Sequence, residues 1–331
     1  MIKRSILFVT LSIFAGVVTN ASEQDELREL VIIHTNDFHG HIKEEKEYAG
    51  AARISAFVDQ HRKQSSGVLF LDAGDAISGT PVSTMYKGLP VFRVMNAMKY
   101  DAGVLGNHEF DHGFQHIASF REISNHPLLS ANVFDAEGSL IGDSEHQILE
   151  VNGITVGIIG LTTDKTPAMV TPIGNAGLIF QNPGKVLEEQ VAILRPRVDL
   201  LVVLSHVGHE EEKVLAESIP GIDIIVGGHS HTLVEIPVKV GSTYIAQAHR
   251  YGTHVGLLHF WVDTDTNTVH DFSGKLVAAA NLPVASPDVL EIVNFWEAKV
   301  EKLVDMEITN SDEEIQADKL QKIIETIIAQ V

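Results

Sequence analysis

The chain has 331 residues, of which 44% are hydrophobic, so its length permits one large domain or two modest ones. Its formal net charge of -20 opposes binding to nucleic-acid polymers and to anionic membrane surfaces. The chain has no cysteine, which excludes disulfides and a lipid attached through an N-terminal cysteine, so we expect its stability to come from packing and metal ions.

The first 21 residues are typical of a secretory signal peptide. Lys3 and Arg4 precede an apolar stretch from Ser5 to Val18, and Thr19-Asn20-Ala21 offers a small-residue cleavage site. The alternative, a transmembrane anchor, requires roughly 20 apolar residues, which is more than this stretch supplies. We therefore expect export to the periplasm or the medium, a mature chain that begins near Ser22, and no stable membrane anchor.

From Leu30 onward, short β-branched runs alternate with longer amphipathic ones, which indicates a layered α/β domain. In chain order, the pattern predicts strands at 30–34, 68–71 and 102–105, with helices at 51–61 and 91–98 between them. Each strand is followed by a polar segment: Asp37-Phe38-His39, Asp72 to Asp75, and Gly106 to Glu109. Because strand ends in an open α/β sheet converge on one crevice, we expect these segments to meet there.

The middle of the chain continues the alternation. Segments 146–151 and 154–161 form a predicted hairpin, because Asn152-Gly153 suits a type I′ turn. A helix at 183–194, a strand at 200–204, a helix at 210–218 and a strand at 224–226 follow. Ser205-His206 and Gly227-Gly228-His229-Ser230-His231 lie at the ends of these two strands.

The remainder predicts antiparallel strands from 233 to 277, then helices at 289–304 and 312–329 separated by a cap at Thr309-Asn310-Ser311. A polar turn near Asp263 resembles the start of an EF-hand calcium loop. Thr268 at its sixth position and Gly274 at its twelfth break that pattern, so we expect a hairpin turn instead. Two sheets with helices outside them and a helical tail are the simplest packing.

Two of the polar segments carry candidate metal ligands of different kinds. Asp37 and His39 are two residues apart after a strand, so a tight turn would let both face one ion; the alternative is a loop aspartate with a surface histidine. Asp75 follows Gly74 at a strand end, where its carboxylate could bridge two ions roughly 3.5 to 4 Å apart. The alternative for Asp75 is a turn or N-cap aspartate.

The segment Gly106 to Asp111 places different chemical groups side by side. Asn107 offers a neutral carbonyl oxygen to a metal, and His108 would point toward the leaving group. Asp111, three residues on, can orient the imidazole and raise its basicity. The alternative is an ordinary Asn-His turn capped by Glu109.

The remaining candidate ligands are histidines. His206 or His209 can be a ligand, and His206 is favoured because it lies nearer the strand end. His229 and His231 form a His-x-His pair after two glycines, which allow the backbone to turn sharply beside a metal. Three further histidines close to these motifs are expected to support the ligands from behind or to be exposed: His34, His41 and His112.

These segments, read in order, resemble the N-terminal metallophosphatase domain of the secreted 5′-nucleotidase family over residues 30 to about 305. The resemblance implies a calcineurin-like α/β fold, a four-layer αββα sandwich. It implies that Asp37, His39 and His231 bind one metal, that Asn107, His206 and His229 bind the second, and that Asp75 bridges them. His108 and Asp111 would be the catalytic dyad, and Asn107 and His108 would contact the substrate phosphate.

The expected organisation is a signal peptide at 1–21, a metallophosphatase domain at 22–285, and a linker helix with a short helical tail at 286–331. Two-domain members of the family continue into a C-terminal substrate-binding domain that supplies nucleobase-stacking aromatics and phosphate-binding arginines. We expect that domain to be absent here, so the nucleobase site has no candidate residues and a protein partner cannot be named.

The expected function is metal-dependent hydrolysis of phosphate monoesters, 5′-nucleotides first among them, by water that two divalent ions activate. Zinc, manganese and cobalt all suit the mixed nitrogen and oxygen ligands. Within the same family, the alternatives are a 2′,3′-cyclic nucleotide phosphodiesterase and a UDP-sugar hydrolase. From another class, the alternative is a catalytically weak, exported metal-binding protein.

Overall fold

The computed structural model describes residues 27–310, so the predicted signal peptide and the predicted helix at 312–329 lie outside the described residues. Two six-stranded sheets form its centre. The first sheet has the spatial order β14 (Thr268–Ala278), β13 (His254–Asp263), β1 (Leu27–Thr35), β2 (Val68–Asp72), β3 (Ala102–Val104), β4 (Leu128–Leu129). The second has the order β11 (Val238–Val240), β12 (Thr243–Ala246), β10 (Ile224–Gly227), β9 (Leu200–His206), β7 (Ile154–Thr162), β6 (His146–Val151).

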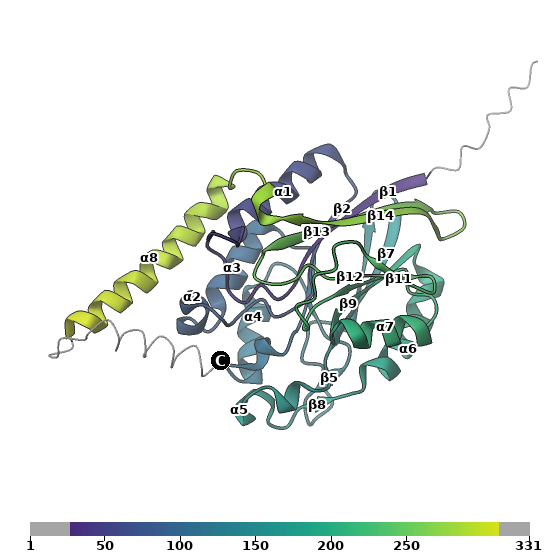
Figure 1. The fold of residues 1–331 in the computed structure, drawn as a ribbon. Coiled ribbons are helices and arrows are strands. Elements are labelled where there is room, and N and C mark those ends of the chain that lie inside the picture. Colours follow the sequence, from purple (N-terminus) through teal and green to yellow (C-terminus); the bar gives the residue numbers. More distant parts are fainter. Residues whose placement is uncertain (1–26, 311–331) are drawn as a thin grey trace, which may run out of the picture.

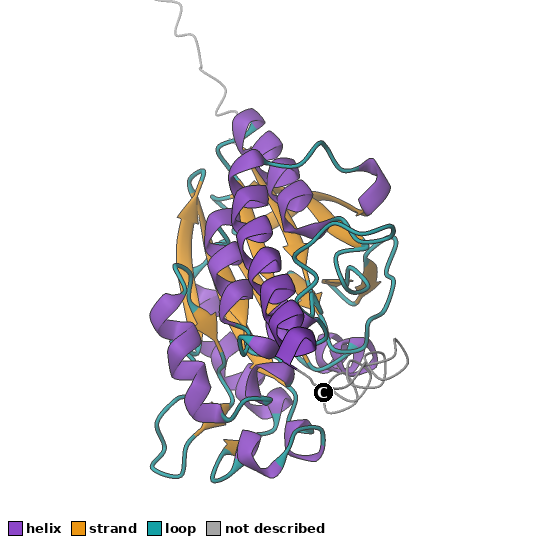
Figure 2. Ribbon diagram, turned by 90° about the vertical axis from the view of Figure 1, so that its left-hand side faces the viewer, coloured by secondary structure: helices purple, strands orange, loops and turns teal. Residues whose placement is uncertain are grey.

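Helices cover the outer face of each sheet. Figure 1 shows one group of helices beside the first sheet and α6 and α7 beside the second. Figure 2 shows the strands in orange behind the first group. That group comprises α1 (Gly50–Gln64), α2 (Pro81–Met85), α3 (Leu89–Met98), α4 (Ile117–Ile123) and α8 (Pro287–Asn310). The other helices are α5 (Pro172–Asn175), α6 (Pro183–Leu194) and α7 (His209–Ser218), and a small sheet pairs β5 (Val133–Phe134) with β8 (Ile179–Phe180).

Side-chain alternation along the strands separates the core into three layers. In β1, Val31 and Ile33 pack against the helices of the first group, whereas Leu30 and Ile32 pack between the two sheets. In β9, Leu201 and Val203 face α6 and α7. These apolar layers on both faces of both sheets confirm the four-layer αββα arrangement.

Parallel strands predominate in each sheet, with antiparallel pairs at one edge of the first sheet and at both edges of the second. Strands β1 to β4 run parallel in the first sheet, and β7, β9, β10 and β12 run parallel in the second. The prediction of antiparallel strands at 233–277 is confirmed for the pairs β11–β12 and β13–β14, but β12 also pairs in parallel with β10. The short strand β11 pairs with β12 on its outer side and runs antiparallel to it, so β12 lies beside β10 with the same direction.

The predicted turns and helix ends can be compared with the structure directly. Asn152 and Gly153 have φ values of 52° and 74°, which a type I′ turn requires. Asp263 accepts hydrogen bonds from the backbone N–H groups of Asp265 and Thr266, as expected for a hairpin turn between β13 and β14. Helix α8 continues through residues 309 and 310, so the predicted break there is wrong up to the end of the described residues.

Within residues 27–310, no helix combines the length and the apolar character that crossing a bilayer requires.

His34, in β1, is fully buried and neither of its ring nitrogens has a hydrogen-bond partner within the described chain. The ring packs over Gly256 of β13, where an added Cβ would lie 1.8 Å from the His34 Nε2 atom. Burial lowers the pKa of His34 to about 3. His34 is therefore a neutral core residue, and the expectation that it supports the ligands or is exposed is wrong.

A pH dependence of stability follows from this burial. Below pH 6.5 the unfolded chain binds a proton at His34 that the folded chain does not bind until about pH 3. The free energy of unfolding should fall, as pH decreases from 6.5, with a contribution of about 1.4 kcal/mol per pH unit from this residue. Urea unfolding from pH 7 to pH 4.5, with chelator present, should show a shallower decline for His34→Leu. The exposed His270→Leu is the control, and equal slopes for His34→Leu and the unmodified protein would contradict the assignment.

Candidate metal centre

The predicted site residues lie just beyond the C-terminal ends of parallel strands from both sheets. In the first sheet, Asp37 follows β1, Asp75 follows β2 and Asn107 follows β3. In the second, His206 is the last residue of β9 and His229 follows β10. Because the two sheets face each other, these strand ends meet at one place, as the sequence predicted.

Several of these residues have left-handed backbone conformations, which non-glycine residues adopt rarely. The φ values are 50° at Asp37, 48° at His39, 54° at Asp75, 73° at His229 and 52° at His231. Backbone hydrogen bonds hold the first two loops together: Asp37 N–H donates to the Gly74 carbonyl at 2.9 Å and His39 N–H to the Asp75 carbonyl at 2.9 Å. The strained loops therefore fix one another and aim their side chains inward.

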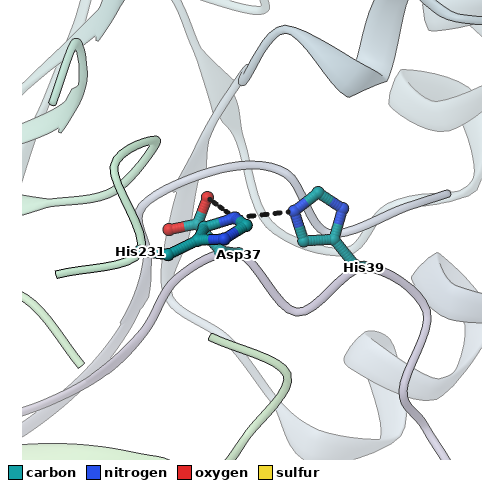
Figure 3. Close-up of side chains that lie close together, drawn as sticks. All are labelled: Asp37, His39 and His231. Carbon is teal, nitrogen blue, oxygen red and sulfur yellow. Dashed lines mark hydrogen bonds and ion pairs between the residues drawn. The ribbon is translucent and has the colours of Figure 1, made fainter. Parts of the chain in front are cut away.

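Asp37, His39 and His231 form the first cluster of potential ligands. His231 Nε2 lies 3.4 Å from Asp37 Oδ1 and 3.2 Å from His39 Nε2, so one imidazole nitrogen faces both neighbours (Figure 3). Burial lowers the pKa of His39 to about 4 even though Asp75 and Asp37 act to raise it. A neutral imidazole has a lone pair available for a metal ion.

Asp75, His206 and His229 form the second cluster. His206 Nδ1 donates to the Ala73 carbonyl at 2.7 Å, which directs its Nε2 toward Asp75 Oδ2 at 3.0 Å. Asn107 Oδ1 lies 2.9 Å from His229 Nδ1 at the same place. His206 Nε2 is buried and has no hydrogen-bond partner among the described residues. Burial lowers the pKa of His206, but the Asp75 carboxylate outweighs burial and raises it to about 10, so positive charge is favoured at this nitrogen.

The Asp75 carboxylate belongs to the second cluster and also forms a third group of potential ligands with His39 and His108, so it links the two clusters. Its Oδ2 atom lies 3.8 Å from His39 Nε2 and 3.0 Å from His206 Nε2. Burial raises the pKa of Asp75, but the nearby His206 and His108 outweigh burial and hold it well below its ordinary value. A buried anion between two groups of nitrogen and oxygen donors, with His206 Nε2 directed at it, fits a pair of divalent cations.

His108 and Asp111 lie beside the clusters. His108 Nδ1 is 2.7 Å from Asp111 Oδ2, and the Asp111 carboxylate also accepts a hydrogen bond of 2.6 Å from Ser78 Oγ. The His108 ring centroid is 4.8 Å from that of His39. Burial lowers the pKa of His108, but Asp75 and Asp111 outweigh it and raise it to about 9. These carboxylates favour the protonated imidazole, and the His108 side chain remains 25% exposed.

The sequence interpretation missed the part played by Glu109, which it considered only as the cap of an Asn-His turn. The carboxylate is buried and accepts four backbone hydrogen bonds, from the N–H groups of Asp75, Ala76, Ile77 and Gly106. It thereby joins the loop after β2 to the loop after β3. Its position between His108 and Phe110, inside the segment Gly106 to Asp111, was the available signal.

Replacing Glu109 with Ala should lower the free energy of unfolding by about 3 kcal/mol or more. Each buried N–H group left without an acceptor costs about 1–3 kcal/mol. Urea unfolding with chelator present, so that metal loss does not contribute, measures this change. Glu150→Ala, an exposed glutamate in β6, is the control. Matching unfolding midpoints for the Glu109 and Glu150 variants would contradict the role assigned to Glu109.

Asn36 is a second residue that the sequence interpretation passed over. Its side chain donates to Asp37 Oδ2 and to the His249 carbonyl, both at 2.6 Å, and accepts from the Ala248 N–H at 2.7 Å. It therefore ties the loop that carries Asp37 to the segment after β12. Its place directly before Asp37 was the only signal in the sequence.

The other histidines near the motifs, His209, His41 and His112, do not belong to the ligand clusters. His209 lies outside the clusters, with Nδ1 3.9 Å from Glu212 Oε2, so His206 and not His209 joins Asp75. His41 is half-buried and stacks on Tyr251, whose ring also contacts those of His39 and His231. His112 is half-buried near His116, away from the clusters.

Comparison with known proteins follows the same segments. The calcineurin-like phosphoesterase family matches residues 30–233. The 5′-nucleotidase of Bos taurus is 32% identical over 317 residues, covering 85% of this chain and 54% of the bovine protein. That of Vibrio cholerae serotype O1 is 33% identical over 298 residues, covering 77% of this chain and 54% of its own length. The chain thus spans about half the length of these curated relatives.

A solved structure agrees with the sequence comparison. The structure of a 5′-nucleotidase precursor from Thermus thermophilus superimposes with a TM-score of 0.75 at 31% identity, covering 83% of this chain and 60% of that one. The fold and the clustered ligands define a metallophosphatase domain. The chain belongs to the calcineurin-like phosphoesterase family. The resemblance to 5′-nucleotidases that the sequence motifs indicated is confirmed.

Proposed function

We propose that this protein hydrolyses phosphate monoesters, with 5′-nucleotides as the substrate class. The observation that carries the proposal is the Asp75 carboxylate placed between two groups of donor atoms, with the His108–Asp111 pair beside it. The 5′-nucleotidases similar to this chain support the substrate class.

We assign Asp37, His39 and His231 to one divalent cation, and Asn107, His206 and His229 to the other, with Asp75 shared by both. When bound, such a pair of cations lowers the pKa of a water molecule and neutralises negative charge on a phosphoryl group. Zinc, manganese and cobalt suit these nitrogen and oxygen donors.

The chain's own residues would position the phosphoryl group and supply a proton. Asn107 and His108 would bind the phosphoryl oxygens. The His108 imidazolium, held by the Asp111 carboxylate through Nδ1, would give its Nε2 proton to the leaving oxygen. Ser78, which donates to Asp111, keeps the carboxylate in place. No side chain would become phosphorylated.

The remaining predictions belong to this proposal. We propose residues 22–285 as the metallophosphatase domain and 286–331 as a linker helix with a helical tail, preceded by a cleaved signal peptide at 1–21. The sequence pattern of residues 3–21 supports export to the periplasm or the medium. The proposed ligand is a small phosphorylated molecule and not a nucleic-acid polymer, consistent with the net charge of -20.

An activity panel tests the proposal. Purified protein is assayed with AMP, p-nitrophenyl phosphate, a 2′,3′-cyclic nucleotide and a UDP-sugar, before and after chelation and with each of zinc, manganese and cobalt added back. We expect hydrolysis of AMP and p-nitrophenyl phosphate that chelation removes and metal restores. Turnover of the cyclic nucleotide or the UDP-sugar alone would assign a different substrate class, and metal binding without any turnover would contradict the proposal.

A further inference from the structure

The candidate site is open at two of its residues. The His108 and His231 side chains are 25% and 26% exposed, whereas Asp37, Asp75 and His206 are buried. These two histidines mark two open edges of the site. The proposed mechanism assigns proton donation to His108 at one edge and only a metal ligand, His231, at the other. The side chain next to His231 at that edge is Arg250, which is exposed.

The backbone around Arg250 is strained and fixed. His249 and Tyr251, its two neighbours, have φ values of 63° and 59°. The Asn36 side chain donates to the His249 carbonyl at 2.6 Å, and the Tyr251 N–H donates to the Asp37 carbonyl at 2.8 Å. Hydrogen bonds on both sides of Arg250 therefore tie its loop to Asn36 and Asp37.

The Arg250 guanidinium group makes its contacts mainly with residues of the candidate site. Arg250 Nη1 lies 3.3 Å from His231 Nδ1, and the group lies over the Tyr251 ring at 4.9 Å from its centroid. No carboxylate among the described residues lies within ion-pair distance of it, in a chain of net charge -20. Most of its five N–H donors have no acceptor from residues 27–310.

The contact with His231 depends on the tautomer of that ring. When His231 binds a cation through Nε2, its Nδ1 carries the hydrogen and cannot accept from Arg250. The guanidinium then needs another acceptor. Only the His231 ring separates it from the proposed cation position, so an anion bound at the open face of the site would lie close to it. Guanidinium groups bind phosphoryl oxygens through paired N–H donors.

We propose that Arg250 binds the non-bridging oxygens of the reacting phosphoryl group and makes the site selective for monoesters over diesters. The inference rests on the proposed phosphoesterase function. A terminal phosphoryl group has a second pKa near 6, so it carries close to two negative charges at neutral pH. A diester carries one charge and places a second ester group where the guanidinium would lie. Arg250 therefore favours the first kind of substrate by both charge and shape.

The test compares kcat/KM for p-nitrophenyl phosphate and bis-p-nitrophenyl phosphate in the metal-loaded, full-length protein. Arg250→Ala should lower the value for the monoester about 10- to 100-fold and that for the diester less than about threefold, the range that a charged hydrogen bond represents. Arg250→Lys, which keeps the charge and loses the paired donors, should fall between. Arg197→Ala removes an exposed arginine elsewhere and should behave as the unmodified protein.

Equilibrium binding of inorganic phosphate separates this inference from the proposed function. Calorimetry on metal-loaded protein should show phosphate binding that Arg250→Ala weakens about 10-fold or more and Arg197→Ala leaves unchanged. This readout holds even if the unmodified protein shows no turnover, a result that would overturn the proposed function alone. Equal losses for monoester and diester, or unchanged phosphate binding in Arg250→Ala, would overturn the role of Arg250.

Discussion

Replacing Asp75 with Asn is expected to remove both metal ions and to lower turnover by about 1,000-fold or more. The carboxylate lies between His39 and His206, so it is the one charged group that both proposed cation positions share. Asparagine keeps the shape and can still accept the hydrogen bond from the His108 N–H at 2.8 Å, but it removes the negative charge. Several kcal/mol of charge stabilisation correspond to a rate effect of this size.

Metal content after dialysis, measured by inductively coupled plasma mass spectrometry, checks this result alongside turnover. His231→Ala should lose one ion of the two, because His231 belongs to the first cluster alone. Asp143→Asn, which breaks an ion pair with Arg121 outside the site, should retain both. An Asp75→Asn protein that keeps two equivalents of metal would exclude Asp75 as the shared ligand.

The gathering of the candidate ligands could be foreseen because it depends on short-range rules. Each motif follows an apolar run that is long enough to read as a strand, and parallel strand ends meet at one edge. The same rules gave the Asn152-Gly153 turn, whose two positive φ values only a few residue types tolerate. His206 was preferred over His209 for the same reason, and the structure places His206 with Asp75.

Individual hydrogen bonds and packing contacts of residues outside the predicted ligand set could not be foreseen. Glu109 acts through backbone N–H groups of the loop after β2, and backbone groups leave no signature in a sequence. Arg250 lies 19 residues after His231 in the sequence. Its position depends on the hydrogen bond that Asn36, in the loop after β1, donates to the neighbouring His249 carbonyl. The prediction for His34 was wrong because its burial depends on Gly256. Gly256 lies in β13, which is far from β1 in the sequence but pairs with it in the sheet.

The parallel pairing of β12 with β10 and the full length of α8 were also not predicted from the sequence. Amphipathic spacing locates a strand but does not say which neighbour it pairs with, and β12 pairs with both β10 and β11 in opposite senses. Helix α8 packs on α1, α2 and α3 and continues through Thr309 and Asn310, which favour a cap by local propensity. Tertiary contacts decide such boundaries more strongly than local propensity does.

Replacing His108 with Ala is expected to lower turnover by about 100- to 10,000-fold while both metal ions remain bound. His108 donates a hydrogen bond to Asp75 through its backbone N–H, which alanine retains, and its imidazole is assigned to neither cation, so the proposed ligands are unchanged. Its side chain instead pairs with Asp111 at 2.7 Å, which favours the protonated ring and agrees with a pKa raised to about 9. The loss should therefore fall on proton transfer and not on metal binding.

The identity of the leaving group makes this prediction sharper. A proton donor matters most when the departing oxygen is strongly basic, so His108→Ala should impair hydrolysis of an alkyl phosphate far more than that of 2,4-dinitrophenyl phosphate. Asp111→Asn, which keeps the ring in place without the negative charge, should show the same trend with a smaller loss. His116→Ala, a histidine that contacts the Lys87 carbonyl away from the clusters, should match the unmodified protein on both substrates. If His108→Ala lost the same factor on both leaving groups, its imidazole would bind the phosphoryl group without donating the proton, and the leaving oxygen would have to take its proton from water.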